Sequence, residues 1–78
     1  MSLNKALDNI FYEVFNYKGK LTDDLDPSSI SGWDSVAHIA MIESLESHFS
    51  IMLTTEEMVQ MTSVRKIKDV LKNYNIEH

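Results

Sequence analysis

Apolar residues recur at spacings of three and four along most of this 78-residue sequence, and this spacing limits the fold to helices. Residues three and four apart share one face of an α-helix, whereas a half-buried strand would show strict alternation, which no stretch does. The first helix is predicted over about residues 2–17, with Gly19 ending it. Its apolar stripe consists of Leu3, Ala6, Leu7, Ile10, Phe11, Val14 and Phe15.

Three further helices are predicted after residue 33. A second helix of about 14 residues is marked by Val36, Ile39, Ile42, Leu45 and Phe49. In "IMLTTEEMVQM", Thr54 followed three residues later by Glu57 predicts a capping box at the start of a short third helix. A fourth helix, capped by Thr62 or Ser63, is marked by Val64, Ile67, Val70, Leu71 and Tyr74. The fold class is therefore all-α, a small four-helix bundle with a short third helix and a long loop between the first two helices.

The loop "KGKLTDDLDPSSISGW" is rich in turn-forming residues, and Pro27 disfavours helical geometry at the residue before it. Its apolar residues Leu21, Leu25 and Ile30 are expected to anchor it to the core. Asp24, Asp26 and Ser28 occupy alternate positions, as in a calcium-binding EF-hand loop. That interpretation fails, because serines (Ser29 and Ser35) stand where the EF-hand needs glycine and a bidentate glutamate.

The small size of the chain means one domain, residues 1–78, whose stability depends on apolar packing, since no cysteine can form a disulfide or a thiolate metal site. The apolar stripes predict a shared core made of Leu7, Ile10, Val14, Ile39, Leu45, Phe49, Ile67 and Leu71. No two histidines have the spacing of a metal site, so His38, His48 and His78 are expected on the surface and no metal is predicted.

The charges are unevenly distributed along the sequence. Every Lys and Arg lies in the first 20 or the last 16 residues, whereas residues 21–62 hold eight acids and no Lys or Arg. Such an anionic surface repels nucleic acids and attracts basic patches of partner proteins. No apolar run is long enough to insert in a membrane or to act as a secretion signal, so a cytoplasmic location is expected.

Ser35 stands where the loop gives way to the second helix, in "SGWDSVAHIAMIESLESHF". It could be a cap, a nucleophile or an attachment point. Nothing in the sequence supports hydrolysis, since the strained G-x-S-x-G turn of serine hydrolases is absent. Asp34 is a good helix cap, because its carboxylate can accept from free backbone N–H groups and meets the positive end of the helix dipole.

The long loop, the Asp-Ser pair at the start of an amphipathic second helix, and the short third helix occur together in this sequence. In this combination the sequence resembles the acyl carrier protein family, across essentially the whole chain. The family's attachment motif Asp-Ser-Leu appears as "DSV", its Leu-Glu-x-x-Phe as "LESHF", and its gly-ile-x-ile-pro pattern loosely as "SIMLT". The sequence departs from the family at Val36, which replaces leucine, and at positions of the second helix that often carry acids, here Ala37, Ala40 and Ser47. Trp33 is more typical of specialised carriers in polyketide, lipopeptide or cell-envelope pathways.

The resemblance implies that Ser35 carries a covalent 4'-phosphopantetheine arm, with Asp34 supporting its attachment. The chain would then be a freestanding, monomeric carrier and not an enzyme, passing acyl or aminoacyl thioesters between enzymes of fatty-acid, polyketide, lipopeptide or cell-envelope biosynthesis. Its expected partners are a phosphopantetheinyl transferase and acyl-transferring or acyl-activating enzymes with basic docking patches. The residues expected to contact them are Val36, Met41, Glu43 and Glu46.

The alternative is a protein that binds partners through the second helix but carries no prosthetic group. A small acidic helical adaptor would bind partner proteins through its second helix. A carrier that keeps the fold but is never modified would have the same sequence features.

Overall fold

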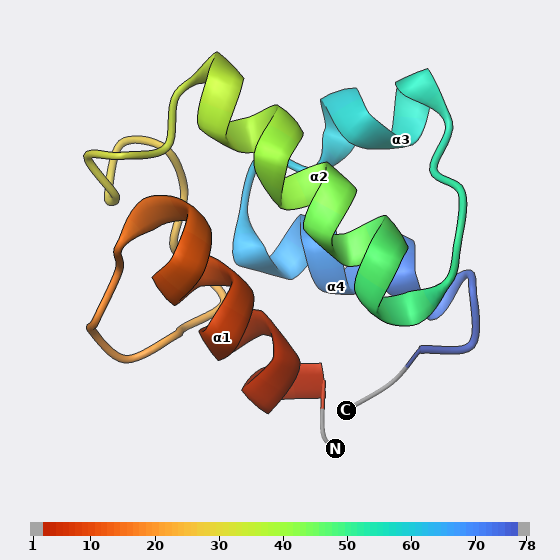
Figure 1. Cartoon of the computed structure of the whole chain (residues 1–78), viewed down its shortest axis with the longest axis horizontal. Coiled ribbons are helices and arrows are strands. Elements are labelled where there is room, and N and C mark those ends of the chain that lie inside the picture. Colours follow the sequence, from red (N-terminus) through yellow and green to blue (C-terminus); the bar gives the residue numbers. More distant parts are fainter. Residues whose placement is uncertain (1–2, 77–78) are drawn as a thin grey trace.

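The computed structural model describes residues 3–76 and consists of four helices, with no strand in this part of the chain. The helices are α1 (Leu3–Phe15), α2 (Ser35–Phe49), α3 (Thr55–Gln60) and α4 (Val64–Lys72). Helix α1 packs beside α2, while the short α3 packs on α4, and a long loop leads from α1 to α2 (Figure 1). The all-α bundle with a short third helix and a long first connection is thus confirmed.

Side-chain caps begin the last three helices. The Asp34 carboxylate accepts from the backbone N–H of Ala37 at 2.8 Å at the start of α2. The predicted capping box is present in α3, where Thr54 and Glu57 each accept from the other's backbone N–H. Of the two candidates for the α4 cap, Ser63 fills the role by accepting from the backbone N–H of Lys66. Each cap satisfies N–H groups that have no partner within the helix.

Helix α1 is shorter than predicted, ending at Phe15 instead of at about residue 17. Asn16 takes the left-handed conformation, with φ of 55°, which a continuing helix cannot contain. Asparagine adopts this conformation more readily than most residues. The helix therefore stops two residues before the predicted end, at the last residue of its apolar stripe.

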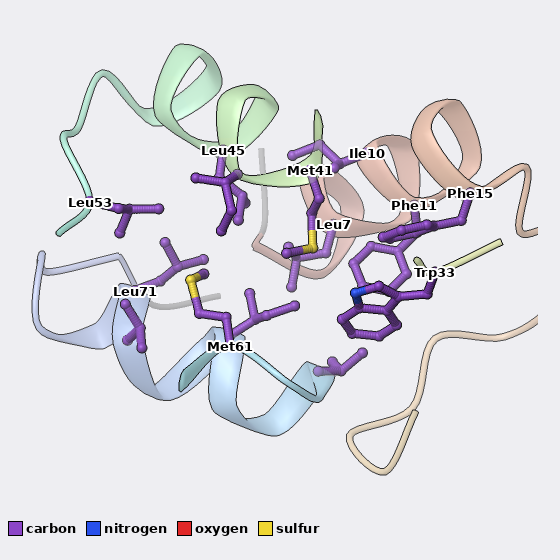
Figure 2. Packing of buried hydrophobic residues seen from close by; sticks show 14 of the residues in the cluster. Leu7, Ile10, Phe11, Phe15, Trp33, Met41, Leu45, Leu53, Met61 and Leu71 are labelled. Atoms are coloured by element: carbon purple, nitrogen blue, oxygen red, sulfur yellow. The ribbon is translucent and has the colours of Figure 1, made fainter. Parts of the chain in front are cut away.

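The core is a single cluster of buried side chains from α1, α2, α4 and the segments between the helices, whereas α3 itself contributes none (Figure 2). Five of the eight predicted core residues are buried, namely Leu7, Ile10, Leu45, Ile67 and Leu71. Val14 and Phe49 are half-buried and pack against the cluster. The prediction for Ile39 is wrong, because its side chain is 60% exposed.

Backbone hydrogen bonds fix the long loop to the start of α4. The carbonyl of Leu25 accepts from Val64 N–H at 2.9 Å, and that of Asp23 accepts from Arg65 N–H at 3.0 Å. The Asp23 carboxylate also pairs with Lys68 Nζ at 2.7 Å. Ile30 is buried, and Leu21 and Leu25 pack against the core, so the three predicted anchors are confirmed.

Candidate functional site

Ser35 is exposed and is the first residue of α2. Contacts with the rest of the protein fix the positions of Gly32 and Asp34, just before Ser35. Gly32 lies against the end of α1, where a Cβ atom would come within 3.1 Å of the Phe15 carbonyl oxygen. Asp34 caps the helix with both its side chain and its carbonyl, which accepts from His38 N–H at 2.8 Å. The predicted cap is confirmed, and it holds the Ser35 hydroxyl at the solvent-facing start of the helix.

Trp33 is a core residue, which the sequence did not reveal. Its side chain is 5% exposed and lies against two rings of α1, with ring centroids 5.4 Å from Phe11 and 5.1 Å from Phe15 (Figure 2). Edge-to-face and offset aromatic pairs at such distances add stability beyond their buried area. The residue two positions before Ser35 is therefore anchored in the core, so the end of the loop is held in place.

His38 links three segments and is not the surface histidine that was predicted. The half-buried imidazole accepts from the Trp33 indole Nε1–H at its Nδ1, at 2.9 Å, and its Nε2 lies 2.9 Å from the Met58 carbonyl oxygen of α3. Because indole can only donate, Nδ1 must be the unprotonated nitrogen and Nε2–H the donor to Met58. Both ring nitrogens are thus engaged, and His38 is not placed to act as a base toward Ser35 one turn earlier.

A surface groove of about 550 Å³ lies between α2 and α3, and Ser35 is one of its lining residues. Its walls are mostly apolar. The lining residues include Trp33, His38 and Ile39 on one side and Met58 and Val59 on the other. Pro27, Asp34, Ser35, Thr55 and Thr62 complete the lining. The exposed Ile39 and the 69% exposed Val59 are therefore walls of one groove beside Ser35.

The structure changes the predicted docking residues. Val36 is 78% exposed and Glu43 is exposed, as a docking role requires. The prediction for Met41 is wrong, because its side chain is fully buried between the helices. Ile39 shares a face of α2 with Val36 and Glu43, at helical spacings of three and four. We call these three exposed residues, Val36, Ile39 and Glu43, the α2 face.

Glu46 was expected to contact partner enzymes, but its carboxylate has a structural partner within the chain. Its Oε2 accepts from the backbone N–H of Leu53 at 2.9 Å, and the side chain is half-buried. His48, in contrast, is exposed near the end of α2, and His78 lies outside the described residues.

Hydrogen bonds favour the ionised forms of Asp26 in the loop and of Glu57 in α3. Ser28 donates to the Asp26 carboxylate and lowers its pKa, assisted by Ser29. The backbone N–H of Thr54 lowers the pKa of Glu57, assisted by the Tyr74 hydroxyl. Within residues 3–76 no three acidic or histidine side chains converge as a metal site would require.

The fold and the exposed serine at the start of α2 define an acyl-carrier-protein-like bundle, and comparison with solved structures supports this. The chain superimposes on a candidate acyl carrier protein from Mycobacterium tuberculosis with a TM-score of 0.84 and 15% identity, over 94% of this chain and 99% of the other. At that identity the likeness concerns the fold alone. No protein-family model and no curated protein sequence matches the chain.

A second solved structure is more similar in sequence. The holo acyl carrier protein from Geobacter metallireducens has a TM-score of 0.79 and 28% identity, over 100% of this chain and 97% of the other. The likeness to solved acyl carrier proteins thus extends over essentially the whole chain. No helix in the described part of the chain has the length and apolar character needed to span a membrane.

Proposed function

We propose that the chain is an acyl carrier protein that holds acyl or aminoacyl groups as thioesters on a 4'-phosphopantetheine arm attached to Ser35. The observation that carries this proposal is the place of Ser35, exposed at the first residue of α2 and in the lining of an apolar groove. An attachment serine must be reachable by a modifying enzyme, and the fixed loop before it presents the hydroxyl without covering it.

The chemistry of attachment suits this position. The Ser35 hydroxyl oxygen would bond to the phosphorus of the phosphopantetheine unit of coenzyme A, adenosine 3',5'-bisphosphate would leave, and the hydroxyl proton would pass to the transferase. The resulting phosphodiester anion would lie at the positive end of the α2 dipole, which favours negative charge. The arm's thiol would then supply the reactivity that a cysteine-free chain lacks.

The α2 face is the proposed docking surface for the transferase and for acyl-transferring or acyl-activating enzymes. It begins one residue after Ser35 and combines two exposed aliphatic side chains, Val36 and Ile39, with the exposed carboxylate of Glu43. Asp34 and the acids of the preceding loop extend the anionic surface, so basic patches suit the partners. The carrier would work in the cytoplasm as a monomer, in fatty-acid, polyketide, lipopeptide or cell-envelope biosynthesis.

Intact-protein mass spectrometry tests the proposal. The protein is incubated with coenzyme A and a phosphopantetheinyl transferase of broad specificity, alongside Ser35→Ala and a matched control, Ser47→Ala, which alters another exposed serine of α2. Wild type and Ser47→Ala should each gain the mass of one phosphopantetheine, and Ser35→Ala should gain none. A wild-type protein that stays unmodified would instead favour the acidic adaptor.

A further inference from the structure

His38 connects two sides of the groove beside Ser35. Its Nδ1 accepts from Trp33, which ends the loop and is anchored on α1, and its Nε2–H donates to the Met58 carbonyl of α3. Trp33, His38 and Met58 all line the groove. The shape of the groove at this point therefore depends on an imidazole that accepts on one side and donates on the other.

Only one protonation state of His38 can make both hydrogen bonds. The neutral tautomer with its proton on Nε2 satisfies both partners, whereas the other neutral tautomer satisfies neither. In the imidazolium form both ring nitrogens carry protons, so the ring has no nitrogen that can accept from the indole N–H, whichever way it is turned. Protonation keeps a donor for Met58 but removes the acceptor for Trp33.

We propose that His38 is a positioning residue that fixes the groove beside Ser35 only in its neutral form, and that protonation of its ring releases Trp33 and changes the groove. The Trp33 indole is buried, and a buried donor without an acceptor is strongly disfavoured. The movement thus affects the Trp33 side of the groove, while α3 keeps its bond to His38. The proposal concerns the unmodified chain and does not depend on attachment at Ser35.

His38 is the one histidine in the lining of the groove. Besides His38, the one ionisable side chain in the lining is the carboxylate of Asp34, from the residue before α2. Helix α3 contributes Thr55, Met58 and Val59 to the lining, and its Glu57 bonds Thr54 and Tyr74 instead. Carboxylates do not ordinarily titrate between pH 6 and 8, whereas histidine does.

The single tryptophan of the chain makes the test direct, because it gives one indole N–H resonance in ¹⁵N NMR. As the pH falls from 8 to 6, this resonance should shift and Trp33 should become more accessible to acrylamide in the wild type. The exposed His48 provides the matched control, so His48→Gln should behave as the wild type does. His38→Gln, which cannot titrate, should show no such change. An equal pH response in His38→Gln and the wild type would overturn the proposal.

Trp33→Phe gives an independent readout that uses urea unfolding. Phenylalanine keeps a ring among Phe11 and Phe15 but removes the N–H that His38 accepts. Because the bond exists only with neutral His38, it contributes to stability at pH 8 and is lost as the pH falls. The gap between the urea midpoints of wild type and Trp33→Phe should therefore narrow from pH 8 to pH 6. A gap that is the same at both values would contradict the proposal.

Discussion

The Glu46 carboxylate and the backbone N–H of Leu53 form a 2.9 Å hydrogen bond that ties the last turn of α2 to the segment before α3. The backbone carbonyl of Glu46 also accepts from Ile51 N–H at 3.1 Å. Glu46→Ala should therefore lower the free energy of unfolding by about 1 kcal/mol, since a backbone donor loses a charged acceptor. Glu43→Ala, which removes an exposed acid of the same helix, is the control. Urea denaturation compares them, and equal losses would show that the bond contributes nothing.

Because Glu46 bonds Leu53, its substitution would not be a clean test of docking at the α2 face. Reversing Glu43 and Glu46 together would mix a docking effect with a structural one, so the charge reversal is confined to Glu43. Glu43→Lys should slow phosphopantetheine loading at low salt, and raised salt should reduce the difference from wild type, because salt screens exposed charges. Glu13→Lys, on the exposed surface of α1, is the control.

The contribution of the aliphatic residue Val36 of the α2 face can be measured in the same loading assay. Val36→Asp should slow loading at low and at high salt alike, since it removes an apolar contact that salt does not screen. Val36 is 78% exposed, so its replacement should leave the unfolding midpoint nearly unchanged. Loading at the wild-type rate by both Glu43→Lys and Val36→Asp would place docking elsewhere on the molecule.

Ser50 is held in the left-handed conformation, with φ of 56°, at the end of α2. This conformation is costly for most residues but not for glycine, which stands at this position in the family pattern. Ser50→Gly should raise the free energy of unfolding by about 0.5–1 kcal/mol. Ser47→Gly, in the interior of α2, should lower it by about 1 kcal/mol or less, because glycine disfavours helix. Thermal melts distinguish the two, and a stabilising Ser47→Gly would contradict this account.

The hydrogen bonds at the start of α3 predict a loss of stability in acid. The Thr54 backbone N–H, assisted by the Tyr74 hydroxyl, lowers the pKa of Glu57 below its ordinary 4.5. Folding thus favours the carboxylate, whose contribution is present above pH 4.5 and is lost as the pH falls through the folded-state pKa. Glu57→Gln should accordingly lose less stability than the wild type between pH 6 and pH 3.5. Urea midpoints at the two pH values check this, and equal losses would count against it.

The sequence predicted the helices well because their signals are local. Apolar spacing and the caps at Asp34, Thr54 and Ser63 are contained in a few consecutive residues, and the structure confirms each of them. The end of α1 was placed two residues too late, because it is set by the left-handed turn at Asn16 and not by the glycine at position 19.

The errors on α2 have a different cause. Apolar residues cover more than one face of this helix, so spacing alone could not show that Met41 faces the core and Ile39 the groove. The roles of Trp33 and His38 depend on α1 and α3, which are distant in sequence. The sequence held one signal of their contact, because Trp33 can donate a hydrogen bond and His38 can accept one, and the two residues flank Ser35.

Locating the modification tests the central claim most directly. After loading, cleavage on the amino side of Asp34 and the carboxyl side of Glu43 releases residues 34–43, in which Ser35 is the sole serine. The loop serines, Ser28, Ser29 and Ser31, then lie in a different fragment. Fragment mass spectrometry should find one phosphopantetheine on residues 34–43 and none on the loop fragment. Phosphopantetheine on the loop fragment, or on any serine other than Ser35, would contradict the assignment.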